Sequence, residues 1–171
     1  MPRYYKYRRA YKRVYPRKRW ASNMLTRNTL VTLGNGEKGA SATETLCVNS
    51  TQATTPTPVM IKFGRVKVVG DVRTDVDSNN NYVSGIMYVV FCPQGMVIDS
   101  SLIDNHPEYI LGWTQISLDS GNTFSFSSTL KRNLNSGDKI GILFTINSVN
   151  AVQAVRNFNF YYTAQFWTTS A

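Results

Sequence analysis

The segments KIGILFTI (residues 139–146) and NFNFYYTAQFWT (residues 157–168) decide the fold class of this chain. Apolar residues occupy every second position in both segments: Ile140, Ile142, Phe144 and Ile146, then Phe158, Phe160, Tyr162, Ala164 and Phe166. In the second segment the residues between them are mostly polar. An alternation with a period of two places one face of a strand in a core. Each segment is therefore predicted to be a β-strand with one buried face.

The whole chain after Ala21 has a similar composition, with short runs of Thr, Val, Ile, Phe and Tyr between clusters of Gly, Asn, Asp and Ser. This pattern is typical of antiparallel β proteins, and no helix of ordinary length is predicted. The eight predicted strands span residues 24–33, 43–48, 59–69, 82–92, 109–117, 123–130, 139–146 and 157–168. The apolar parity of the third strand switches across Gly64 and Arg65, which predicts a β-bulge there.

Two long connections, residues 49–58 and 93–108, interrupt the strands. Long crossovers between sheets are what Greek-key and jelly-roll topologies require. The run from Ile86 to Cys92 is apolar on both faces, which predicts a strand covered on both sides by loops or by a neighbouring subunit. We expect an all-β protein with a single eight-stranded jelly roll, an antiparallel β-sandwich. An OB-fold would leave three strands unused, and a ribonucleoprotein-type domain would need two helices.

The cysteines, the histidine and the apolar runs exclude several classes of protein. Cys47 and Cys92 both lie in apolar runs, which favours buried thiols. The single histidine, His106, and the lack of Cys-x-x-Cys spacing leave too few ligands for a zinc site, so no metal or cofactor is expected. No apolar run reaches the about 20 residues of a membrane span, and the N-terminus lacks the apolar stretch of a secretory signal. We therefore expect neither a membrane span nor secretion.

Catalysis is not expected either. His106 with Glu108 and Asp104 could be drawn as an acid–base set, but no nucleophile is tied to these residues. A lone loop histidine beside a proline is more often structural. The chain is therefore predicted not to be an enzyme.

The first 20 residues carry the whole net charge of the chain. They hold nine basic residues and no acidic one, and the remaining stretch holds ten of each, so the +9 belongs to the N-terminal arm. A block of like charge repels itself and is stabilised by a polyanion. Aromatic residues interleave the cations, which places faces for base stacking beside groups that pair with phosphates. The candidate nucleic-acid-binding residues of the arm are Arg3, Tyr4, Tyr5, Lys6, Tyr7, Arg8, Arg9, Tyr11, Lys12, Arg13, Tyr15, Arg17, Lys18, Arg19 and Trp20.

This composition predicts sequence-tolerant binding of single strands, because stacking needs unpaired bases and the arm supplies no rigid element to read a groove. We expect residues 1–20 to form a disordered or extended arm and residues 21–171 to form the jelly-roll domain. The arm could also serve as a nuclear localisation signal, which is compatible with nucleic-acid binding. An alternative is an amphipathic surface helix, since Tyr4, Tyr7, Tyr11 and Val14 recur at helical spacing.

Weaker candidates for phosphate contact lie in the body of the chain. Arg65 and Lys67 share one face of their strand, and Lys131 and Arg132 form a second basic pair.

The residues that carry a family resemblance lie along the whole chain. They are the arm MPRYYKYRRAYKRVYPRKRW (1–20), FGRVKVVGDV (63–72), HPEYI (106–110), LKRNLNSGDKI (130–140) and the closing NFNFYYTAQFW (157–167). These stretches resemble the capsid proteins of circoviruses and related small viruses with circular single-stranded DNA. The resemblance implies an arm that binds the genome, followed by one jelly roll.

The resemblance also implies a virion protein that self-assembles into an icosahedral shell with T=1 symmetry and about 60 copies, with the arms facing inward. The implied partners are single-stranded DNA or packaged RNA, other copies of the chain, and host nuclear import receptors, with assembly in the host nucleus. Met96, Ile98, Tyr109 and Trp113 could anchor contacts between copies or simply cover the core. The alternative is a cellular nucleic-acid-binding β-barrel module, ribosomal or chaperone-like, while a lectin-type jelly roll would leave the arm unexplained.

Overall fold

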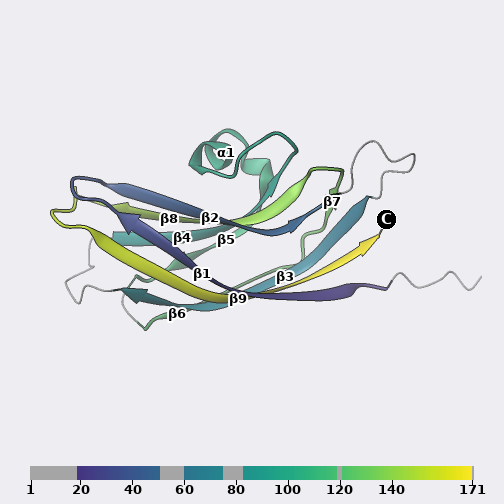
Figure 1. The fold of residues 1–171 in the computed structure, drawn as a ribbon, viewed down its shortest axis with the longest axis horizontal. Coiled ribbons are helices and arrows are strands. Elements are labelled where there is room, and N and C mark those ends of the chain that lie inside the picture. Colours follow the sequence, from purple (N-terminus) through teal and green to yellow (C-terminus); the bar gives the residue numbers. More distant parts are fainter. Residues whose placement is uncertain (1–18, 51–59, 75–82, 119–120, 171) are drawn as a thin grey trace, which may run out of the picture.

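Two antiparallel sheets lie face to face in the computed structural model, which describes residues 19–50, 60–74, 83–118 and 121–170 (Figure 1). The five-stranded sheet contains β1 (Ala21–Leu33), β9 (Arg156–Ser170), β3 (Ile61–Thr74) and β6 (Thr123–Ser128) in that order, with the short β7 (Arg132–Leu134) beside β3. The four-stranded sheet contains β2 (Gly39–Val48), β8 (Lys139–Ser148), β4 (Val83–Cys92) and β5 (Ile110–Ile116) in that order.

The first strands of the chain pair with its last strands. β1 pairs with β9 over its whole length, and β2 pairs with β8 in the other sheet. β3 and β6 then join the five-stranded sheet, while β4 and β5 join the four-stranded sheet. This antiparallel connectivity is that of a jelly roll, so the predicted fold class is confirmed. β7 is an addition to the eight predicted strands, and its three residues are too few to show a period in the sequence.

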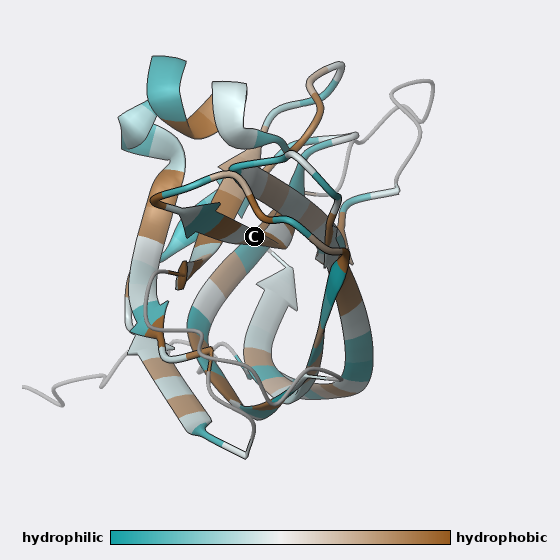
Figure 2. Cartoon of the chain, turned by 90° about the vertical axis from the view of Figure 1, so that its left-hand side faces the viewer, coloured by the Kyte–Doolittle hydropathy of each residue, from teal (hydrophilic) through white to brown (hydrophobic). Residues whose placement is uncertain are grey.

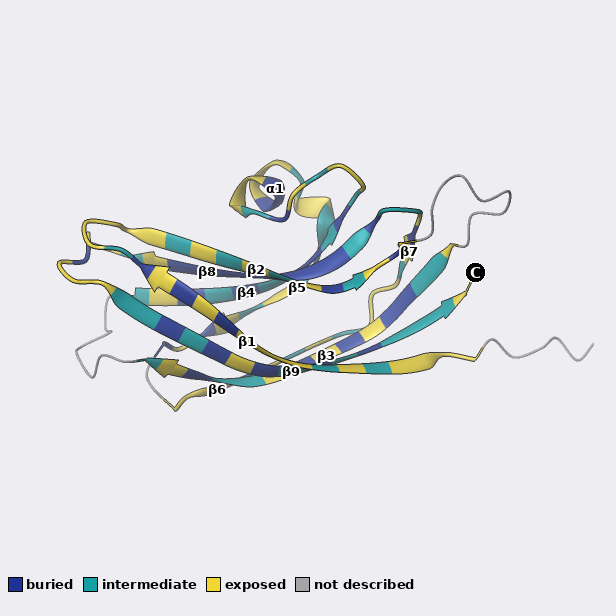
Figure 3. Ribbon diagram, in the orientation of Figure 1, coloured by how far each residue is buried: buried dark blue, intermediate teal, exposed yellow. Residues whose placement is uncertain are grey.

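The alternating residues of β8 and β9 form the core between the sheets, as predicted. All nine apolar residues of the two alternating patterns belong to one buried cluster. The rings of Phe144 and Phe160 stack across the sheets with centroids 4.5 Å apart, and Phe124 meets both rings edge-on. Figure 2 shows brown and paler bands alternating along the strands, and Figure 3 shows the matching alternation of buried and more exposed residues.

β4 is covered on both faces, as the apolar run from Ile86 to Cys92 predicted. Met87 and Val89 lie in the core between the sheets, whereas Val90 and Cys92 face the opposite side. There they form a second buried cluster with Leu143 and with three residues of the 93–109 connection, Ile98, Leu102 and Ile103. Met96 and Tyr109 pack against this cluster, so the connection is a cover over the outer face of the four-stranded sheet.

The cover contains two short helices that the sequence analysis did not predict, α1 (Ser100–Asn105) and the 3₁₀ helix η1 (Pro107–Tyr109), and neither has the length of an ordinary helix (Figure 1). Asp99 is the N-cap of α1, and its side chain accepts a hydrogen bond from the Leu102 N–H at 2.8 Å. The cap satisfies a backbone donor that would otherwise lack a partner at the helix start. A helix of six residues is too short for its periodicity to stand out in the sequence.

The predicted β-bulge in β3 is confirmed by a shift of register against β9 between Phe63 and Val66. Gly64 and Arg65 stand opposite the single residue Trp167 of β9, so the bulge inserts one residue. This extra residue keeps both Phe63 and Val66 in the core although they are three positions apart. Arg65 and Lys67 are exposed on the opposite side. β3 also runs on to Thr74, five residues past its predicted end.

Both cysteines are free thiols. Cys92 is buried as predicted, whereas Cys47 is only half-buried and packs against the core from the edge strand β2. Desolvation raises the pKa of both thiols. In the part of the chain that the structure describes, no helix has the length and apolar character needed to cross a membrane.

Candidate nucleic-acid interface

The structure describes only the last two arm candidates, because residues 3–18 lie outside the described ranges. Arg19 and Trp20 directly precede β1 and are both exposed. β1 begins beside the end of β9, with Ala21 opposite Thr168. The arm therefore joins the body at the corner of the five-stranded sheet where β1 starts and β9 ends (Figure 1).

The bulge in β3 provides a seat for the Trp20 indole. A Cβ atom built on Gly64 would lie 2.6 Å from Cζ3 of Trp20, well inside van der Waals contact. The ring therefore rests on bare glycine backbone, and any side chain at position 64 would displace it. Since Gly64 does not adopt a positive φ, the closeness of the ring, not the backbone conformation, requires glycine here.

Two cations and a second indole complete a cleft around Trp20. The Lys131 Nζ lies 5.7 Å from the centroid of the Trp20 ring, and the Arg65 guanidinium lies 5.7 Å from the centroid of the Trp167 ring. Both distances are in the range of cation–π contacts. Trp20, Gly64, Arg65, Lys131 and Trp167 together line a hollow of about 420 Å³, which we call the Trp20–Trp167 cleft.

Three of the predicted candidates thus come together, although they are far apart in the sequence: Trp20 from the arm, Arg65 from the bulge and Lys131 from the segment before β7. Lys67 lies on the same side of β3 as Arg65, opposite Gln165 of β9 and Ser127 of β6 in the sheet register. It extends the basic surface from the cleft toward the middle of the sheet.

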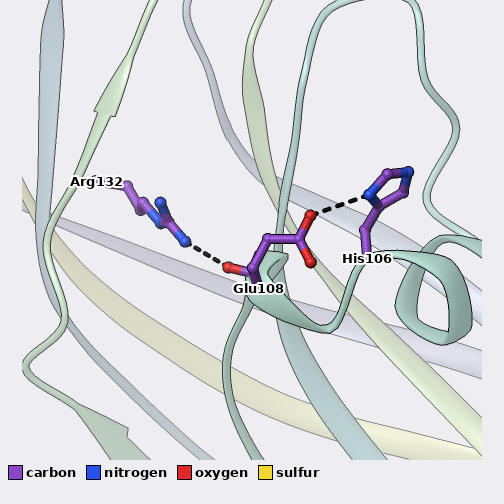
Figure 4. A network of polar contacts seen from close by, with 3 residues as sticks. All are labelled: His106, Glu108 and Arg132. Carbon is purple, nitrogen blue, oxygen red and sulfur yellow. Dashed lines mark hydrogen bonds and ion pairs between the residues drawn. The ribbon is translucent and has the colours of Figure 1, made fainter.

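Arg132 does not line the cleft and instead contacts Glu108 and Phe91. Its guanidinium donates a hydrogen bond to the backbone carbonyl of Glu108 (Figure 4). The same guanidinium lies 5.6 Å from the centroid of the Phe91 ring. The Glu108 carboxylate in turn is 3.0 Å from Nδ1 of His106, and the His106 ring stacks on Tyr109. Arg132 therefore ties β7 to the cover over the four-stranded sheet, away from Lys131 and the cleft.

The carboxyl group of Glu108 has a lowered pKa, first because its own backbone N–H donates to it and then because of the hydrogen bond from His106. Both residues are solvent-exposed, and their contacts hold the short turn of η1 in place. In the ranges that the structure describes, no three or more His, Cys, Asp or Glu residues gather in a group that could hold a metal ion.

A second aromatic–cation pair lies farther along the same sheet face. The Arg73 guanidinium is 5.5 Å from the centroid of the Tyr161 ring, and its Nε donates to the Asp71 carboxylate at 3.0 Å. The hydrogen bond that Arg73 donates to this carboxylate is the main cause of the raised pKa of Arg73. These residues line an open hollow with Thr26 and Val69, about 820 Å³ in volume.

Sequence reasoning missed three residues of this face, and two of them carried a readable signal. Trp167 and Tyr161 lie at odd-numbered positions of β9, whereas the buried Phe166 and Tyr162 lie at even-numbered positions. Because successive residues of a strand point to opposite faces, the sequence already predicts that both odd-numbered residues face outward. Arg73 gave no such signal, because it lies beyond the predicted end of its strand.

No protein-family model matches this chain, and no curated protein matches it in sequence. Solved structures of similar fold include the 60-mer BFDV capsid protein, at a TM-score of 0.41 and 10% identity, covering 91% of this chain and 95% of that chain. They also include turnip yellow mosaic virus, at a TM-score of 0.41 and 11% identity, covering 90% of this chain and 94% of that chain.

A third similar structure is the semi-empty virus-like particle of the giant freshwater prawn Macrobrachium rosenbergii nodavirus, at a TM-score of 0.38 and 8% identity, covering 99% of this chain and 93% of that chain. Scores and identities at this level do not assign the chain to any of these families.

Proposed function

We propose that this chain is a viral capsid protein whose jelly roll builds an icosahedral shell and whose arm packages single-stranded DNA. One observation carries the proposal: the entire +9 charge sits in residues 1–20, in front of a formally neutral jelly roll. A neutral β-sandwich can pack against copies of itself without repulsion, while a detached polycation needs a polyanion to neutralise it.

The division of the chain follows from this charge distribution. Residues 1–20 act as the nucleic-acid-binding arm and residues 21–171 as the shell domain. The arm pairs phosphates with its nine cations and stacks unpaired bases on its tyrosines and on Trp20. Its basic clusters also serve as the nuclear import signal that brings the protein to the genome in the host nucleus.

The number of copies follows from closed symmetry together with the resemblance to circovirus capsid proteins. A T=1 shell has about 60 identical copies. The arms would then supply roughly 540 positive charges to the interior, which would neutralise a comparable number of phosphates. A genome of the kilobase class would be partly balanced by these arms and partly by other cations.

Contacts between copies would form through exposed apolar side chains of the shell domain. Trp113 on β5 is 61% exposed, and aromatic residues are favoured at such contacts. Ile98, in contrast, is buried in the second cluster and serves the fold of its own subunit. Met96 and Tyr109 are partly buried against the same cluster, so Trp113 is the most exposed of the four interface candidates.

The test is electron microscopy of the purified recombinant full-length protein, with the ratio of absorbance at 260 and 280 nm recorded first. The expected result is uniform closed shells that carry nucleic acid. Small particles that carry nucleic acid would instead indicate the cellular binding module, and small particles without it would contradict both readings.

A matched variant separates shell building from packaging. Replacing all nine arm cations by glutamine keeps the length and the aromatic residues of the arm but removes its charge. Shells should still form and should contain far less nucleic acid, because the shell domain buries its own core.

A further inference from the structure

The outer faces of the two sheets differ in how far other parts of the described chain cover them. The cover with α1 packs on the four-stranded sheet, whereas side chains on the outer face of the five-stranded sheet, including Val69 and Tyr161, are exposed. The arm also joins the body at a corner of this exposed face. A ligand held by the arm therefore meets the five-stranded sheet first.

We propose that the outer face of the five-stranded sheet is a binding track for single-stranded nucleic acid, which begins in the Trp20–Trp167 cleft and follows β9 to the Tyr161–Arg73 pair. This inference rests on the proposed function of the arm. It adds a second, folded site of stated geometry to the site formed by the arm.

The chemistry of the cleft fits one unpaired nucleotide. Its two indoles offer flat faces for a base, and stacking on an aromatic side chain tolerates any base. Arg65 and Lys131 lie at the same hollow and supply charge-assisted donors for the adjoining phosphates. The cleft also has its own structural requirement, because the Trp20 ring can take this place only over a residue without a side chain, Gly64.

The spacing of the two aromatic–cation pairs fits a short stretch of single strand. Trp167 and Tyr161 are six residues apart on one strand, which corresponds to roughly 20 Å at about 3.3 Å per residue. That length accommodates up to about six nucleotides at the stacked rise of about 3.4 Å, and fewer if the strand is stretched. Site sizes of about 4–16 nucleotides are usual for folded single-strand-binding domains.

The surface between the two pairs suits a phosphate backbone. Gln165 and Thr163 of β9 lie in register with Lys67 and Val69 of β3 along this stretch. Hydroxyl and amide groups beside a cation are frequent phosphate contacts. Among the residues that the structure describes, the cations Arg65, Lys67, Arg73 and Lys131 lie along this stretch, and the Asp71 carboxylate there is paired with Arg73.

The experiment measures binding of a fluorescent 12-nucleotide oligo(dT) to the full-length protein by anisotropy, for the wild type and four variants. Gly64→Ala displaces the indole and removes no functional group, and Trp167→Ala removes the second ring. Gly39→Ala, a glycine in the four-stranded sheet, and Lys38→Gln, an exposed lysine in the β1–β2 loop, are the matched controls. Circular dichroism of each variant reports whether it is folded.

We expect Gly64→Ala and Trp167→Ala each to weaken oligo(dT) binding about fivefold or more, the loss of one stacked base, while both controls bind like the wild type. Unchanged affinity in a folded Gly64→Ala variant and a folded Trp167→Ala variant would overturn the track. Loss of shell assembly in these variants with normal oligo(dT) binding would also overturn it, and would make this face a contact between copies.

The glutamine-substituted arm distinguishes failure of the track from failure of the proposed function. If that variant loses binding and the cleft variants do not, the arm binds nucleic acid and the track does not. If the wild-type protein itself fails to bind oligo(dT) at low salt, the proposed function fails together with the track. Residual binding by the arm variant that Gly64→Ala then abolishes would support the track directly.

Discussion

The outer faces of the two sheets differ in polarity and in exposure to solvent, although antiparallel strands form both sheets. On the four-stranded sheet, Val90, Cys92 and Leu143 make part of the outer face apolar, and the connection with α1 covers that part. On the five-stranded sheet, the outward residues of β9 are polar or amphipathic, among them Tyr161 and Trp167, and they stay partly open. A strand that is apolar on both faces thus belongs to the sheet that needs a cover, and a strand that alternates belongs to the sheet that faces a ligand or solvent.

The difference separates two roles within one small domain. The covered sheet contributes its outer surface to stability, because a second apolar cluster forms there. In our proposal the open sheet contributes its outer surface to nucleic-acid binding, since cations and indoles lie there beside the root of the arm. Substitutions on the two outer faces should therefore have different consequences.

The largest effect is expected when the nine cations of the arm are replaced by glutamine. Each contact to a single strand contributes about −0.7 to the slope of log K against log salt, so nine contacts contribute about −6. The slope measured with oligo(dT) should become shallower by about this amount. An unchanged slope would mean that the arm does not contact phosphates and that the open sheet acts alone.

Phe160→Ala should damage both faces at once, because the ring stacks on Phe144 between the sheets. Removing a buried phenyl ring costs about 3–5 kcal/mol of unfolding free energy. Denaturant unfolding would measure the loss, and oligo(dT) binding should fall in step with the folded fraction. A fully stable variant would show that the stacked rings do not hold the sheets together.

Leu102→Ala should damage only the covered face. Leu102 is 3% exposed and packs in the second cluster, so the substitution should cost about 2–3 kcal/mol. Amide exchange should accelerate in α1 and remain slow in β9, and oligo(dT) affinity should stay at the wild-type value. Equal acceleration in β9 would show that the two outer faces are not separable.

Asp99→Ala should have a smaller effect on the same cover. The carboxylate accepts from the Leu102 N–H and from the Ser101 hydroxyl, each at 2.8 Å, and its loss leaves a donor at the helix start without an acceptor. Asp99→Asn preserves a capping acceptor and is the matched control. If the α1 amides of Asp99→Ala exchange no faster than those of the wild type, the Asp99 side chain does not stabilise the helix.

Acidification should have the smallest effect, again confined to the cover. The pKa of Asp99 is lowered by the hydroxyl of Ser101 and by the Leu102 N–H, and that of Glu108 by its own N–H and by His106. Because both folded-state values lie below the ordinary ones, their stabilisation is present above the ordinary carboxyl pKa and is lost as pH falls through the folded-state values. Exchange in α1, corrected for intrinsic rates, should increase relative to β9 below about pH 4. An equal increase of amide exchange in α1 and in β9 at low pH would contradict an effect confined to the cover.

The fold could be predicted from the sequence because the patterns that indicate it lie within single strands. Period-two alternation in β8 and β9 located the core, and the parity switch at Gly64 located the bulge. The helix α1 and the strand β7 were missed because six and three residues are too few to form a period. The cap signal at Asp99, before the apolar Leu102 and Ile103, was the available clue.

The site could be predicted only in part, because it depends on which segments the sheets bring together. Trp20 and Arg65 were candidates by charge and aromatic character, but nothing local shows that Gly64 seats the indole or that Trp167 lies opposite. Lys131 and Arg132 are adjacent in the chain and looked equivalent. The structure turns one toward the cleft and ties the other to Glu108.

The most direct single measurement is an electron cryomicroscopy reconstruction of the full-length protein purified together with its nucleic acid. We predict closed symmetric shells in which the open face of the five-stranded sheet lines the interior and nucleic-acid density lies against Trp20 and Trp167. Shells in which that face points outward, or is buried between copies, would contradict the binding track. Failure to form closed particles at all would contradict the capsid function.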